Sequence, residues 1–216
     1  MKRGKVGFNR PVSPYMIHEG KFSLMNIGRG IGMTNRDGEV IYRIDGNDAL
    51  IEMNEQWDAF AIRNKSPHLV QQNVMRCNLW TFIQDPETRH LHKTLVYRVR
   101  AKKKILNLPF RCDSPALRRF MEMDLLPLAR GVVEFHCRTI KTEPRDAVAL
   151  LVPGRPAGQD LIRMCSWCKK VDVGAGHWVE IEQAVASLRL FERDSLPHIT
   201  HTMCDACLED LGIASL

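Results

Sequence analysis

The residues with the clearest chemistry are two Cys-x-x-Cys pairs, Cys165 with Cys168 and Cys204 with Cys207. A two-residue spacer lets each pair turn back on itself, so that four thiolates can surround one tetrahedral zinc ion. The 35 residues between the pairs are enough for one helix and a return loop. This spacing predicts a zinc-stabilised module over residues 161–216.

Two alternatives use the same thiols: a set of redox disulfides, or four buried cysteines without a shared ligand. We expect a cytoplasmic protein with reduced thiols, because the sequence has neither a secretory signal nor an apolar run of membrane-spanning length. His201 precedes Cys204 at a usable spacing and is a candidate substitute ligand. Four sulfurs are preferred, because Cys165 and Cys168 otherwise lack a role. The remaining cysteines have no paired spacing and are expected in the core: Cys77, Cys112 and Cys137.

The positive charge is concentrated at the N-terminal end. The whole chain carries a formal net charge of +6, of which residues 1–32 contribute +5. The remaining residues are therefore almost neutral, and a zinc ion with four thiolates would add negative charge to them. This distribution argues against nucleic acid as the partner, although basic Lys169 and Lys170 follow the first cysteine pair.

The elements that must position these residues follow from hydrophobic periodicity. Alternation predicts five strands, and 3.6-residue spacing predicts three helices between the second and third strands. Because sequential hairpins need no long crossover, this order predicts an α+β fold with a five-stranded antiparallel sheet and helices on one face. A further helix is expected over residues 177–190, packed on the cysteine knuckles together with Trp167. The expected strands are 39–45, 49–53, 105–112, 117–128 and 131–140; the three helices are one after Asn54, which would cap it, one over 74–83 and one over 87–100.

Residues 49–64, 79–83 and 109–115, the last reading Pro-Phe-Arg-Cys-Asp-Ser-Pro, resemble a bacterial family of small PAS-like proteins. The resemblance covers about residues 38–145 and implies a small cavity between sheet and helices, whose ligand the sequence does not identify. The tail, with Cys-Ser-Trp-Cys and the terminal Cys-x-x-Cys, is similar to a segment appended to PAS-containing sensor kinases and response regulators. Such segments usually carry Ser-His-Gly-Ile-Cys before the last pair, whereas this chain has Thr-His-Thr-Met-Cys over residues 200–204.

These patterns divide the chain into four parts: a flexible basic tail (1–37), a PAS-like domain (38–145), a linker (146–160) and a small C-terminal zinc module (161–216). Within the PAS-like domain, a polar cluster surrounds the turn after residue 112. Asp113 can cap that turn, while Arg111 and either Arg118 or Arg119 can offer a planar fork to an anionic ligand or a partner carboxylate. Strand alternation places Arg118 and Arg119 on opposite faces.

Three classes of function compete. The favoured hypothesis is a cytoplasmic sensory or regulatory protein in signal transduction, acting by protein–protein interaction with another signalling protein or with itself as a dimer, with a small-molecule ligand in the PAS-like pocket as an option. The alternative is a zinc-ribbon-like regulator that binds nucleic acid. An enzyme is not expected: the cysteine pairs lack the His-x-Glu and Pro-Cys-x-x-Cys pattern of zinc deaminases, and four protein thiolates leave no site for water.

Overall fold

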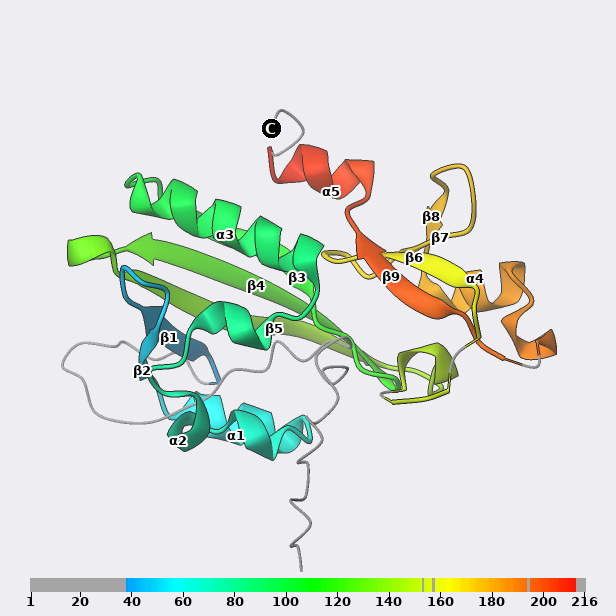
Figure 1. The fold of residues 1–216 in the computed structure, drawn as a ribbon, viewed down its shortest axis with the longest axis horizontal. Coiled ribbons are helices and arrows are strands. Elements are labelled where there is room, and N and C mark those ends of the chain that lie inside the picture. Colours follow the sequence, from blue (N-terminus) through cyan, green and yellow to red (C-terminus); the bar gives the residue numbers. More distant parts are fainter. Residues whose placement is uncertain (1–37, 153, 157, 194, 213–216) are drawn as a thin grey trace, which may run out of the picture.

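The computed structural model describes residues 38–212 apart from residues 153, 157 and 194. The expected basic tail, residues 1–37, lies outside the described residues. Figure 1 shows two sheets, a larger one with long strands and a smaller one near the C-terminal end. The last helix, α5 (Asp205–Asp210), lies beside the long helix α3 (Pro86–Arg100).

The larger sheet has five antiparallel strands, as the sequence predicts. The β1–β2 hairpin joins the β3–β4–β5 meander by pairing of β1 with β5, so the strand order is β2-β1-β5-β4-β3 and β3 forms one edge. The long pair β4 and β5 crosses the sheet and is registered from Leu117 opposite Pro144 to Pro127 opposite Val133. The strands are β1 (Val40–Ile44), β2 (Leu50–Met53), β3 (Ile105–Arg111), β4 (Leu117–Pro127) and β5 (Val133–Pro144).

One face of this sheet is apolar and carries the helices. Tyr42 lies opposite Phe135, and the two rings stack with their centroids 4.4 Å apart. Phe135 in turn lies opposite Leu125, so alternate residues of three strands form one surface. The buried residues of α1 (Gln56–Arg63) and α3 (Pro86–Arg100) join the same hydrophobic core.

The opposite face of the sheet carries ion pairs. Arg43 on β1 bonds Glu134 on β5 at 2.6 Å, and Arg138 on β5 bonds Asp124 on β4 at 2.7 Å. Period-two alternation therefore separates an apolar face from a charged one.

The helix expected over residues 74–83 is wrong. The chain instead forms η2 (Pro67–Leu69), the short α2 (Gln71–Val74) and a 3-10 turn, η3 (Leu79–Phe82). Between α2 and η3 the backbone pairs with β2, where Arg76 N–H donates to the Leu50 carbonyl at 2.7 Å and Leu50 N–H donates to the Cys77 carbonyl at 2.9 Å. Arg76 has a φ of 64°, which a helix does not allow.

The N-cap position of α1 is Glu55, but Asn54 Oδ1 accepts from the N–H of Gln56, the first helical residue, at 3.3 Å, so the expected cap is present in part. The same side chain also joins β1: Oδ1 accepts from Ile41 N–H at 3.1 Å, and Nδ2 donates to the Glu39 carbonyl at 2.7 Å. The start of α3 has a side-chain cap, because Asp85 Oδ1 accepts from Thr88 N–H at 2.6 Å and Pro86 is the first helical residue.

The smaller sheet has the order β8-β7-β6-β9, with β6 and β9 parallel. The helix expected over residues 177–190 is shorter than predicted, because residues 178 and 179 pair with β7 as a strand. The elements are β6 (Leu161–Cys165), β7 (Val171–Asp172), β8 (Trp178–Val179), α4 (Ile181–Ser187), η6 (Leu190–Glu192), β9 (His198–Thr202) and α5 (Asp205–Asp210), preceded by η4 (Ala129–Gly131) and η5 (Ala149–Leu151).

Two hydrophobic cores result, and the cysteines do not belong to the smaller sheet's core. Ile162, Met164 and Val171 pack with α4, and Leu150 from the expected linker joins them. The cysteine pairs, Trp167 and Leu211 pack into the core of the larger sheet. The cysteines therefore lie at the seam between the two sheets.

Candidate metal centre

The first cysteine pair is positioned by the hairpin that joins β6 to β7. Cys165 is the last residue of β6; its N–H donates to the Lys170 carbonyl at 2.7 Å, and its carbonyl accepts from Lys169 N–H at 3.1 Å. Lys169 has a φ of 62°, so the turn folds back tightly enough to face Cys168 toward Cys165.

The second pair is positioned by the strand that runs beside β6. Parallel pairing sets Cys165 opposite Thr202 on β9, and Ser166 N–H donates to the Thr202 carbonyl at 2.7 Å. Cys204 then occupies the N-cap position of α5, and Cys207 lies in its first turn. The strand pairing thus brings together two motifs that are far apart in the sequence.

The geometry of the four sulfurs fits a metal ion. All four Sγ atoms lie within 4.8 Å of one another, and Cys168 Sγ lies 3.7 Å from Cys204 Sγ. Tetrahedral zinc with Zn–S bonds of about 2.3 Å requires sulfurs about 3.8 Å apart. Cys204 N–H also donates to Cys165 Sγ at 3.5 Å, as is usual for a thiolate acceptor.

The protonation states of the clustered thiols depend on one another. Hydrogen bonds from the thiols of Cys168 and Cys207 lower the pKa of Cys165 far below its ordinary value. That thiolate, through the same bonds, raises the pKa of Cys168 and the pKa of Cys207 above their ordinary values. Four thiolates so close together form only when a positive ion offsets their repulsion.

His201 lies outside this group. The metal-capable cluster among the described residues consists of the four cysteines. The buried His201 ring directs Nδ1 toward Asp85, 3.7 Å from its Oδ2, and so connects β9 to the start of α3. Of the other three cysteines, Cys112 and Cys137 are buried, and burial raises the pKa of each thiol.

Trp167, inside the first knuckle, packs on the larger sheet rather than on α4 as expected. Its Nε1–H donates to the Pro109 carbonyl at 2.6 Å, and its own carbonyl accepts from Arg111 N–H at 3.0 Å. Its ring lies 5.6 Å from the His92 ring and 5.8 Å from the Phe110 ring, measured between centroids. The knuckle is therefore hydrogen-bonded directly to edge strand β3.

The arginine cluster makes a second connection between the sheets. Arg111 is buried; its Nε and Nη2 bond Asp113 at 2.9 and 2.6 Å, and its Nη1 lies 3.2 Å from Glu180 Oε1. Burial alone would lower the pKa of Arg111, but the two carboxylates more than offset it and raise that pKa. Arg118 bonds Glu182 at 2.7 Å and Glu143 at 3.2 Å.

Arg119 lies on the other face of β4, as alternation predicts. Its guanidinium donates to the Cys112 carbonyl at 2.8 Å and to Asn64 Oδ1 at 2.7 Å, and lies over the Phe60 ring. The carboxylates that meet Arg111 and Arg118 thus belong to this same chain, while binding of a separate ligand or partner by Arg111, Asp113, Arg118 or Arg119 stays a prediction.

Sequence reasoning missed the acidic partners of this cluster. Glu180 and Glu182 flank the start of α4, and Arg145 also bonds Glu182 at 2.9 Å. The sequence did show two acidic residues at the start of a helix. Carboxylates are common there because they interact favourably with the helix dipole, so the pair did not indicate a contact with arginines. Lys169, which motivated the nucleic-acid alternative, directs its Nζ to the Ser166 carbonyl at 2.8 Å, and its burial lowers the pKa of that ammonium.

No protein-family model matches the chain, and no curated protein is significantly similar to it. Among the described residues, no helix combines the length and the apolar character that crossing a membrane requires.

Proposed function

We propose that this chain is a cytoplasmic regulatory protein of signal transduction, in which a PAS-like module and a zinc-stabilised module act as one unit. The PAS-like module binds a small ligand or a partner. Zinc serves as a structural cross-link rather than as a reaction centre. The output passes through association with another signalling protein or with a second copy of the chain.

One observation carries this proposal: the cysteine cluster packs into the core of the larger sheet, and Trp167 between two of its cysteines is hydrogen-bonded to β3. A change in the sheet would therefore alter the knuckle, and loss of the ion would alter the sheet. The order of two strands, helices and three strands, which the PAS-like interpretation requires, also supports it.

Native mass spectrometry of the reduced full chain tests the proposal. We expect one zinc per chain, together with either an additional bound mass or a dimer. The Cys168→Ser variant should lose the zinc, whereas Cys77→Ser, a cysteine outside the cluster, should keep it. A monomer without zinc or any bound mass would contradict the proposal.

Coupling between the modules is tested by hydrogen exchange. Because Trp167 bonds the edge of β3, removal of zinc by a chelator should speed exchange of the Arg111 amide as well as that of the knuckle. Unchanged amide exchange at β3 would show that zinc binding does not affect the stability of the larger sheet, and would contradict the coupling between the modules.

A further inference from the structure

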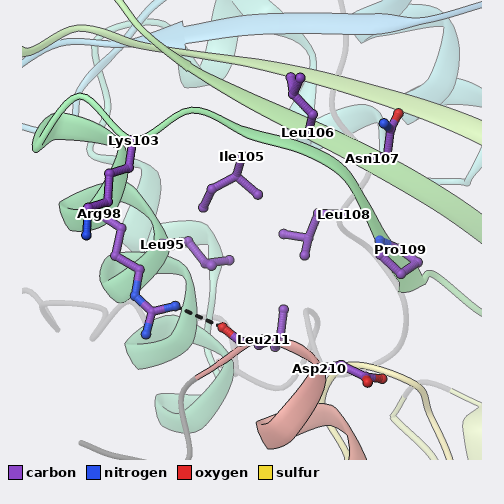
Figure 2. A pocket seen from close by; sticks show the side chains of 10 residues that line it. All are labelled: Leu95, Arg98, Lys103, Ile105, Leu106, Asn107, Leu108, Pro109, Asp210 and Leu211. Atoms are coloured by element: carbon purple, nitrogen blue, oxygen red, sulfur yellow. Dashed lines mark hydrogen bonds between the residues drawn. The ribbon is translucent and has the colours of Figure 1, made fainter.

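A hollow lies between the C-terminal half of α3, edge strand β3 and the end of α5. Its volume is about 450 Å³. Figure 2 shows the side chains of Leu95, Ile105, Leu108 and Leu211 directed into this common space, while Leu106 and Asn107 point away from it. Three separate elements therefore supply one apolar lining.

A second hollow continues the first toward the cysteine cluster. Its volume is about 330 Å³, and it shares Leu108, Pro109, Asp210 and Leu211 with the first. Its far end is lined by Phe110 and Trp167, with further apolar side chains from β4. The two hollows form one groove along β3, which we call the β3 groove; sites of this volume and lining typically hold small molecules.

The edge of β3 is poorly suited to an extended peptide. Pro109 has no N–H, and its carbonyl already accepts from Trp167 Nε1. The outward N–H of Arg111 donates to the Trp167 carbonyl. Main-chain pairing with an added strand is therefore blocked over this part of the groove, and an occupant must be held by side chains.

The charges along the β3 groove differ at its two ends. Arg98 and the exposed Lys103 line the end near α3, and neither forms an ion pair with a carboxylate in the part of the chain that the structure describes. Two donors of Arg98 bond the Leu211 and Gly212 carbonyls, which fixes the guanidinium without neutralising its charge. Asp210 also lines this hollow but forms no ion pair with Arg98 or Lys103 among the described residues. Lys102 and Lys104 add to the positive charge of this turn.

The other end is less favourable for an anion, although two cations also line it. Arg111 there is paired with Asp113 and Glu180, so Lys170 is the remaining positive charge of this lining. Four thiolates around a divalent ion would carry a net charge of about −2 and outweigh that single charge.

We propose that the β3 groove binds an amphipathic carboxylate, with its head group at Arg98 and Lys103 and its apolar tail extending past Leu108 to Trp167. This inference goes beyond the proposed function and does not rest on it.

Three probes of equal chain length test the head group: dodecanoate, dodecylamine and dodecanol, titrated into the zinc-loaded full chain by calorimetry below their aggregation concentrations. We expect dodecanoate to bind at least ten-fold more tightly than dodecylamine. From octanoate to dodecanoate, affinity should rise by up to roughly four-fold per methylene. Equal affinity for all three head groups, or no binding, would overturn the proposal.

Two charge reversals test the position of the head group. Lys103→Glu should weaken dodecanoate binding at least ten-fold, whereas Lys65→Glu, an exposed lysine at the end of α1, should leave it unchanged. Both lysines are exposed, so both variants should fold. An equal loss of dodecanoate affinity in the two variants would show only a general effect of charge. It would overturn the placement of the head group at Lys103.

Brominated probes test the direction of the tail. Bromine quenches tryptophan fluorescence at contact, so 12-bromododecanoate should quench Trp167, whereas 2-bromododecanoate should not. The Trp167→Phe variant identifies the contribution of Trp167 by difference. Stronger quenching by the 2-bromo probe would reverse the orientation and contradict the proposal.

Discussion

The larger and the smaller sheet are stabilised in different ways. In the larger sheet, β4 and β5 pair along almost their whole lengths, and the interleaved apolar side chains meet two helices. In the smaller sheet, β7 and β8 are only two residues long, and one seven-residue helix covers its core. A sheet with so little buried surface needs a cross-link, and the cysteine cluster lies where it can provide one.

Loss of the metal should produce the largest difference in stability between the two sheets. Cys207→Ser should destabilise the smaller sheet by several kcal/mol, because a structural zinc site contributes directly to folding. Peptides from β6 and β9 should then exchange amide hydrogen rapidly, while those from β4 and β5 stay protected. Equal loss of protection in both sheets would show that they unfold as one unit. The two sheets would then not differ in their dependence on the metal.

Arg111→Met tests the buried connection between the sheets. Asp113 would lose its buried partner, since the Arg111 and Asp113 side chains are 7% and 4% exposed. Breaking such a pair on one side costs about 3–5 kcal/mol, which urea unfolding would measure. A cost below about 1 kcal/mol would mean that water or Arg145, 3.4 Å from Asp113, replaces the lost partner.

His92 makes the seam sensitive to pH. Burial lowers the pKa of His92 to about 4, against about 6.5 for the unfolded chain. The unfolded state therefore binds the proton more readily between these values, so stability is full above pH 6.5 and falls as the pH drops toward 4. The loss is on the order of 3 kcal/mol. In urea unfolding, the His92→Leu variant should lack this pH-dependent loss of stability. Metal loss at low pH destabilises both proteins, so the difference in stability between wild type and variant is the quantity that reports on His92.

Arg118→Gln should have the smallest effect. Arg118 is 26% exposed, and its partners Glu143 and Glu182 are about one-third exposed. Solvent-exposed pairs of this kind contribute about 0–1 kcal/mol, so the midpoint of urea unfolding should hardly move. A cost comparable to that of Arg111→Met would show that Arg118 shares the burial of its neighbour.

The parts that could be predicted from the sequence are those set by local spacing. The cysteine pairs have the spacing of a knuckle, and alternation locates the strands of the larger sheet to within a few residues. The helix at residues 74–83 failed because the Leu50 backbone offers competing hydrogen bonds. Arg111 and Glu180 are 69 residues apart, and only the tertiary fold brings them together.

The parallel pairing of β6 with β9 also affects how the chain responds to cutting. The segment between α4 and β9 includes Phe191, whose side chain is 88% exposed, which makes this region accessible to a protease. A cut there would divide the covalent chain, yet an ion held by Cys165, Cys168, Cys204 and Cys207 would still join the two fragments. The nicked protein would behave as one molecule until a chelator released the C-terminal fragment.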